Sequence, residues 1–157
     1  MSDVKTQHAT IVLDRKFDAP VSRVFKAWSD IGAKSRWFVG PPGTWELVER
    51  RMDFRVGGRD HLSGRLPNGI VTIFNSFYYD IVPNARIVYS YDMHLSERHI
   101  TVSLATVEFK QAGKDTQMIF TEQLVNLDDW EDEGGEERKA GTSGQFDRFA
   151  AALKEEW

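Results

Sequence analysis

The chain contains no cysteine among its 157 residues, which excludes disulfide bonds, thiolate nucleophiles and thiolate metal sites together. It also has no apolar run near the ~20 residues of a membrane-spanning helix, and its start has none of the features of a signal peptide. We therefore expect a cytoplasmic protein that does not insert into a membrane. The net charge of −4 argues against nucleic acid as a partner, because nucleic-acid binding normally needs a basic surface.

The sequence motifs of several large enzyme classes are missing as well. There is no nucleophile elbow, Walker loop or dinucleotide-binding fingerprint, so we expect no cofactor and favour a protein without catalytic activity. Histidine is scarce, with four in the chain. His94 and His99 flank a short loop with Asp92 nearby, which could form a surface metal site. Two ligands at a solvated tip more often bind nothing, and we expect no metal.

Apolar and aromatic residues, by contrast, are abundant. The hydrophobic fraction is 41%, and the chain has ten Phe, five Trp and four Tyr. This composition and length are typical of one globular domain. We expect that domain to span residues 1–157, with residues 1–8 as a frayed N-terminal tail.

The end of the chain predicts one long helix over residues 136–157. Large side chains occupy the second half of its apolar stripe, whereas the first half offers only Thr142 and Ser143. The stripe recurs at the helical spacing of i, i+3, i+4 and i+7 and consists of Thr142, Phe146, Phe149, Ala150, Leu153 and Trp157. Such a helix can anchor a core with its bulky half, so we expect a pocket beside its first half.

The rest of the chain alternates between strands and short turns. Residues 9–17 predict a first strand, and residues 18–20 open two short helices that end near Trp37 and Phe38. Further strands are predicted at 45–49, 52–56, 59–66, 70–81, 86–93, 99–109 and 116–125. Short connections favour antiparallel pairing, and long antiparallel strands twist and curl. We expect an α+β fold in which a curved antiparallel sheet wraps around the C-terminal helix.

Strand alternation indicates which side chains face that helix. In 70–81 the odd positions are mostly apolar, so we expect them, and Asn75 among them, to face the helix. In 99–109 the apolar residues change from even to odd positions, which predicts a bulge near Ala105. In 86–93 and 116–125 one clear phase is apolar, apart from Glu122. The candidate ligand-binding residues are Trp37, Phe38, Asn75, Phe77, Tyr79, Tyr89, Tyr91, Met93, Phe120, Glu122, Thr142 and Phe146.

Glu122 is the inward-facing residue that most needs an explanation, because a buried carboxylate is costly unless it is paired or hydrogen-bonded. It can orient a mainly apolar ligand, together with Asn75 and the tyrosines. It can instead pair with Arg55 or Arg59 across the sheet and serve structure alone. As a weaker candidate, it can act as a catalytic general base.

Several local phrases carry a resemblance to a known family. They stand at residues 17–21 (FDAPV), 37–38 (WF), 53–58 (DFRVGG), 79–83 (YDIVP), 86–89 (RIVY), 120–123 (FTEQ), 141–142 (GT) and 147–149 (DRF). Together with the order of elements, they resemble the SRPBCC superfamily, also called START-like, with its helix-grip fold. Within it they resemble single-domain bacterial members of the branch homologous to the activator of the heat-shock protein 90 ATPase.

The resemblance implies a cavity between the sheet and the long helix, with a small hydrophobic or aromatic molecule as its occupant. Many relatives carry a tryptophan just after a glycine early in the last helix. Here Gly141 matches but Thr142 replaces the large ring, which should widen the pocket. The co-chaperone activators also carry a separate preceding domain. Only eight or nine residues precede the first strand here, so we do not expect a chaperone partner.

Three functions are open at this point. The first is a carrier or sequestering protein for a small hydrophobic molecule, working as a monomer or weak homodimer. The second is a cyclase or dehydratase that uses Glu122 with Tyr79, Tyr89 or Tyr91. The third is an adaptor or stress-related, co-chaperone-like protein that works through the outer face of the sheet, which a contiguous apolar patch on Val88, Val102, Leu104 and Ile119 would support.

Overall fold

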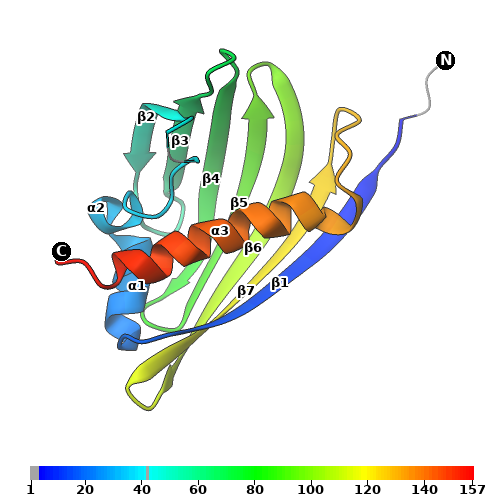
Figure 1. Cartoon of the computed structure of the whole chain (residues 1–157). Coiled ribbons are helices and arrows are strands. Elements are labelled where there is room, and N and C mark those ends of the chain that lie inside the picture. The colour runs from blue at the N-terminus through cyan, green and yellow to red at the C-terminus, as the bar shows by residue number, and fades with distance from the viewer. Residues whose placement is uncertain (1–3, 42) are drawn as a thin grey trace.

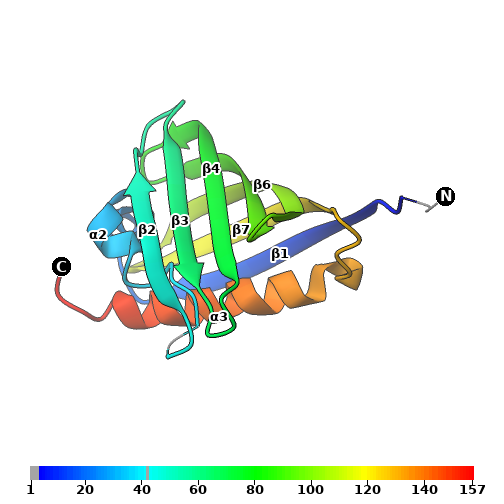
Figure 2. The ribbon, with the colours of Figure 1, turned by 90° about the horizontal axis from the view of Figure 1, so that it is seen from above.

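The computed structural model describes residues 4–41 and 43–157. Within them, seven antiparallel strands form one curved sheet in the order β1-β7-β6-β5-β4-β3-β2. Helix α3 (Glu136–Ala152) lies across the concave face of this sheet (Figures 1 and 2). The predicted helix-grip α+β fold, with two short helices after the first strand, is confirmed.

The boundaries refine the prediction in two places. Residues 52–56 do not form a strand of their own, because the chain turns between Asp53 and Gly58, where Gly57 has φ +85°. The last helix ends at Ala152, and Arg23 donates hydrogen bonds to the free carbonyl of Leu153. The other elements are β1 (Gln7–Phe17), α1 (Val21–Ser29), α2 (Ile31–Lys34), β2 (Glu46–Met52), β3 (Arg59–Arg65), β4 (Val71–Val82), β5 (Arg86–Leu95), β6 (Arg98–Ala112), β7 (Asp115–Asn126) and a 3-10 turn (Glu133–Gly135).

The tail predicted for residues 1–8 reaches too far into the chain. Gln7 and His8 belong to β1, where they pair with Asn126 and Val125 of β7. Residues 1–3 lie outside the described part of the chain. Pairing of β1 with β7 therefore begins two residues before the predicted start of the strand. Gln7 and His8 are polar and add nothing to the apolar alternation, but their backbones can still pair.

The core lies between the bulky half of α3, the two short helices and the inner face of the sheet. Phe149 is fully buried, and its ring centroid lies 4.8 Å from those of Trp37 and Phe17. Trp28 of α1 also packs against Trp37 at 4.8 Å. Aromatic pairs at such distances add to the burial of apolar area, so this end of α3 is held firmly against the sheet.

Strand β4 faces the opposite way from the prediction over most of its length. Its buried residues are at even positions, namely Phe74, Ser76 and Tyr78, whereas Asn75 and Tyr79 are exposed. The register with β5 shifts between Tyr78 and Asp80. This bulge reverses the alternation, so the apolar residues on the two sides of it belong to different faces of the sheet.

A bulge also lies elsewhere in β6 than predicted. The register between β5 and β6 shifts beside His94, and not near Ala105. Ala105 is fully buried in regular alternation with Ser103 and Val107. Val102 and Leu104 consequently face outward, where they are 41% and 43% exposed.

A buried charged network ties α2 to the open edge of the sheet. Lys34 of α2 donates to Asp60 of β3 at 2.7 Å, and Arg50 of β2 and the Tyr78 hydroxyl also donate to Asp60. Burial alone would raise the pKa of the Asp60 carboxyl, but Lys34 and Arg50 outweigh burial and lower that pKa. The network fixes the position of the chain that follows α2.

Candidate functional site

A cavity of about 460 Å³ separates the first half of α3 from the sheet. Its walls come from α3, the inner faces of β3, β4, β5 and β7, the segment between α2 and β2, and Trp28 of α1. Most of the lining is apolar or aromatic. The principal lining residues are Trp28, Trp37, Phe38, Trp45, Leu62, Phe74, Tyr89, Tyr91, Met93, Phe120, Thr142 and Phe146.

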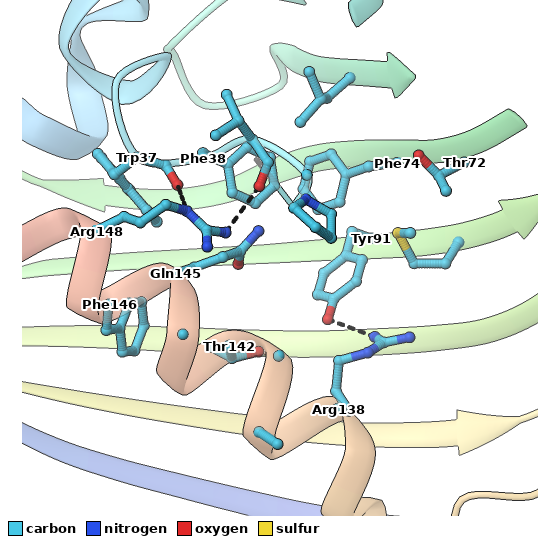
Figure 3. Close-up of a pocket in the computed structure, with 18 of the residues that line it drawn as sticks. Trp37, Phe38, Thr72, Phe74, Tyr91, Arg138, Thr142, Gln145, Phe146 and Arg148 are labelled. Atoms are coloured by element: carbon cyan, nitrogen blue, oxygen red, sulfur yellow. Dashed lines mark hydrogen bonds between the residues drawn. The ribbon is translucent and has the colours of Figure 1, made fainter. Parts of the chain in front are cut away.

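Small residues in the first half of α3 leave this space open. Gly141, Thr142 and Gly144 all line the cavity. A Cβ atom placed on Gly141 or Gly144 would meet no other atom within 4 Å. The bulky residues begin at Phe146, which forms one end of the cavity (Figure 3). The pocket therefore lies where the uneven apolar stripe predicts it.

Trp45 forms a wall that the sequence does not indicate. Its ring packs against the backbones of Gly40 and Gly64, where an added Cβ would come within 2.2 Å and 1.8 Å of ring atoms. The indole N–H donates to Thr72 Oγ1 at 2.9 Å. Glycine is needed at both positions because no side chain fits between the ring and the backbone.

The polar end of the cavity is built around Glu122, which is fully buried on β7. Tyr91 Oη donates to Glu122 Oε1 at 2.7 Å, and Ser103 Oγ donates to Oε2 at 2.8 Å. Arg138 of α3 lies 3.4 Å from Oε2. We call Glu122, Tyr91, Ser103 and Arg138 the Glu122 cluster. The charged partner of Glu122 is therefore Arg138, and the alternative pairing with Arg55 or Arg59 is wrong.

Arg138 joins the sheet to α3 at this end of the cavity. It donates to Tyr91 Oη at 2.7 Å (Figure 3). It also donates to Thr101 Oγ1 at 2.9 Å. Burial and the Glu122 carboxylate raise the pKa of the Tyr91 hydroxyl, although Arg138 opposes them. Tyr91 therefore stays a neutral hydrogen-bond donor over the whole physiological range.

Asp132 sets the direction in which Arg138 enters the cavity. Its carboxylate accepts hydrogen bonds from the backbone amides of Glu137 and Arg138, at 2.8 and 3.0 Å. Amides at the start of a helix have no partner within the helix, so this carboxylate caps α3. Asp132 is the one buried acidic residue between Asp128 and Glu137, and it positions the start of the helix.

A second arginine closes the other end. Arg148 extends from α3 to the segment after α2, where it donates to the carbonyl of Val39 at 3.0 Å (Figure 3). Figure 3 shows Gln145 beside it, on the same side of α3. The cavity is thus bounded by polar contacts at both ends and by aromatic rings between them.

Nine of the twelve candidate residues lie around this cavity. Asn75, Phe77 and Tyr79 do not, because they project from the opposite face of β4; Asn75 bonds to His61, and Tyr79 is 56% exposed. The expectation that these three face the helix is wrong, because it assumes a single alternation along the whole strand, whereas the bulge between Tyr78 and Asp80 reverses the alternation. The nine that line the cavity are Trp37, Phe38, Tyr89, Tyr91, Met93, Phe120, Glu122, Thr142 and Phe146.

The comparisons with known proteins now place this fold. A sequence model of the family described as Activator of Hsp90 ATPase homolog 1-like protein matches residues 18–154. The chain belongs to this family. No curated protein matches the chain. None of the helices in the described residues has the length and apolar character needed to cross a membrane.

Solved structures of related bacterial proteins share the whole fold of this family member. An uncharacterised protein from Rhizobium leguminosarum is 39% identical over 99% of this chain and 100% of its own, with a TM-score of 0.92. The Mll3558 protein from Rhizobium loti is 32% identical over 94% and 99%, with a TM-score of 0.85. The CV1439 protein from Chromobacterium violaceum, at 22% identity over 94% and 98%, shares the fold, with a TM-score of 0.73. The fold of this superfamily is known for ligand binding.

Proposed function

We propose that this protein binds a small, mainly apolar or aromatic molecule in the cavity under α3, as a carrier or sequestering protein. The observation that carries the proposal is the size of the cavity together with its lining. Its volume of about 460 Å³ lies within the roughly 300–1,000 Å³ typical of ligand sites. Without a ligand, the apolar and aromatic side chains that line this partly open cavity would face water, which is unfavourable.

The lining also indicates the chemical class of the ligand. Aromatic rings such as Trp37 and Phe74 offer flat apolar surfaces, which favour an aromatic or polyunsaturated skeleton. The Tyr89 hydroxyl lines the cavity as well, and no side-chain hydrogen bond engages it within the described residues. We therefore expect a ligand with one polar group that reaches Tyr89 or the Glu122 cluster.

The enzymatic alternative is less well supported. A general base needs a lone pair directed at the substrate, but hydrogen bonds from Tyr91 and Ser103 occupy one lone-pair site on each oxygen of Glu122 and fix the carboxylate toward these side chains. Arg138 adds a compensating positive charge. These contacts favour a carboxylate that holds the polar end of the cavity in place.

The outer face of the sheet gives less support to the adaptor alternative. Val102 and Leu104 are exposed, but Val102 pairs with Asp92 as well as Val125, and Leu104 pairs with Ser90 and Gln123. Val88 lies opposite Thr106 and Ile119 opposite Glu108. Polar side chains therefore interrupt the apolar patch that a docking surface requires.

A ligand screen tests the proposal. Lipids, flavonoids and polyketides would be added to the protein while thermal unfolding and tryptophan fluorescence are recorded, because Trp28, Trp37 and Trp45 line the cavity. A ligand at 100 times its Kd adds about 2.7 kcal/mol, so the midpoint should rise by several degrees with a change in fluorescence. If no compound in these classes changes either signal, the proposed binding function is wrong.

A further inference from the structure

A cluster of possible metal ligands lies on the outer face of the sheet, at the β5–β6 hairpin. Tyr91 and Met93 face the cavity, so Asp92 and His94, which alternate with them, point the other way. His99 of β6 pairs with His94 across the hairpin. This hairpin lies at the end of the sheet away from α1 (Figure 1).

The bulge in this hairpin brings the two imidazoles together. The register shifts between Met93 and His94, and Ile100 and Thr101 are buried next to each other as a result. His99 then turns to the face of His94, and the two rings stack with their centroids 4.2 Å apart and their planes 8° from parallel. We call Asp92, His94 and His99 the hairpin triad.

The distances within the hairpin triad suit a metal ion. One ligand atom from each residue lies within 4.8 Å of the others. Asp92 Oδ2 is 3.5 Å from His94 Nε2 and 3.1 Å from His99 Nε2. Ligands about 2.0–2.1 Å from a tetrahedral zinc ion lie about 3.3 Å from one another. The two separations from Asp92 bracket this value. Because the nitrogen lone pairs lie in the ring planes and the rings are stacked, binding requires one imidazole to rotate out of the stack so that both Nε2 atoms point at the ion.

The surroundings of the His99 Nε2 atom also favour a bound metal ion. Its Nε2 atom is buried and has no hydrogen-bond partner among the residues that the structure describes, although Asp92 lies nearby. The Asp92 carboxylate is thus close to His99 Nε2 without forming a well-aligned hydrogen bond with it, and a buried polar atom in that state is unusual in a native structure. The side chains of the triad remain between 27% and 40% exposed, so an ion can reach them from solvent.

Contrary to the expectation from the sequence, we propose that the hairpin triad binds one divalent transition-metal ion, with zinc as the best-fitting ion. Two imidazoles and one carboxylate match the donor set of zinc sites that keep a further position for water. Magnesium and calcium prefer oxygen ligands throughout and do not fit this set. The bound ion would clamp β5 to β6 behind Tyr91 and Met93. This inference is independent of the proposed ligand in the cavity.

Calorimetric titration of the tag-free, chelator-treated protein with zinc chloride tests the inference. We expect one zinc ion per chain and no binding heat with magnesium chloride. His94→Ala, His99→Ala and Asp92→Asn should each weaken zinc binding at least tenfold. His61→Ala is the matched control, because His61 also lies on the outer face, 3.5 Å from the single carboxylate of Glu49, and it should leave the affinity unchanged.

Histidine ring signals in the NMR spectrum of the unsubstituted protein provide a second readout that does not depend on the folding of variants. Zinc should shift the signals of His94 and His99 and leave those of His8 and His61 in place. The inference is overturned if zinc does not bind, if it shifts all four histidines alike, or if folded triad variants keep the original affinity.

Discussion

Gly141 and Gly144 show most directly how single residues shape this cavity. Glycine within a helix lowers stability by about 1 kcal/mol relative to alanine, and an added Cβ at either position would meet no atom within 4 Å. Gly141→Ala and Gly144→Ala should therefore each raise the free energy of unfolding by about 0.5–1 kcal/mol. Urea unfolding measures this change, and a decrease in stability would show that the space beside α3 is not open.

Gly64 should give the opposite result, because its Cα faces the ring of Trp45. Gly64→Ala would force that ring out of the cavity wall, and overpacking of this kind costs about 1–3 kcal/mol. Urea unfolding with fluorescence detection would show both the loss of stability and a changed environment of Trp45. Gly144→Ala serves as the control, since the same chemical change there should stabilise the protein.

Glu122 should matter more for stability than for chemistry. Glu122→Gln keeps the size of the side chain but leaves the partly buried Arg138 without its countercharge, so we expect a loss of about 1–3 kcal/mol. Ligand affinity should stay within a few fold of the original value. Glu108→Gln, on the outer face, should change stability by less than about 0.5 kcal/mol. A fully stable Glu122→Gln protein that has lost catalytic turnover of a substrate would favour the enzymatic alternative.

At the scale of the elements, the buried Asp60 carboxylate holds helix α2 to the sheet, because it accepts hydrogen bonds from Lys34 of α2, Arg50 of β2 and Tyr78 of β4. The pKa of Asp60 lies below its usual value, so its carboxylate contributes stability above about pH 4 and loses it as the pH falls further. We expect Asp60→Asn to be less stable at pH 7 and to lose less stability between pH 5 and pH 2 than the unsubstituted protein. Urea unfolding across this range checks the prediction; parallel acid profiles would contradict it.

The strands show how far the sequence alone can lead. In β5 and β7 the alternation is regular, and the predicted inward residues Tyr89, Tyr91 and Phe120 are buried. In β4 the residues on the two sides of the bulge follow different phases, and both faces carry aromatic side chains. Hydrophobicity therefore does not distinguish the face of β4 that lines the cavity from the outer face, and the sequence pattern wrongly places Phe77 and Tyr79 in the cavity.

The missed residues of the site share a physical reason. Arg138 and Trp45 meet the cavity through contacts between segments far apart in the chain, and neither belongs to a periodic apolar pattern. The one available signal for Arg138 was its position one turn before Thr142 on the same helix, which directs both side chains to one side. The sequence predicts that the buried Glu122 carboxylate needs a partner. That the partner is Arg138 depends on how α3 is positioned along the sheet, which the sequence pattern does not show.

The complete fold divides its interior into a packed half and an open half. The packed half, around Phe146, Phe149 and Trp37, supplies stability. The open half, beside Thr142, costs stability and would be maintained by selection for a ligand. Thr142→Trp should fill the open half, because Thr142 is buried and lines the cavity.

Native mass spectrometry of the unsubstituted protein and of Thr142→Trp, both purified from the original host, tests the central claim most directly. We predict that the unsubstituted protein carries or takes up a small hydrophobic molecule, and that folded Thr142→Trp does not. The claim is contradicted if neither protein binds such a molecule and Thr142→Trp is more stable, because the space would then be poor packing. Equal binding by both proteins would also contradict it, since the ligand would lie outside the cavity.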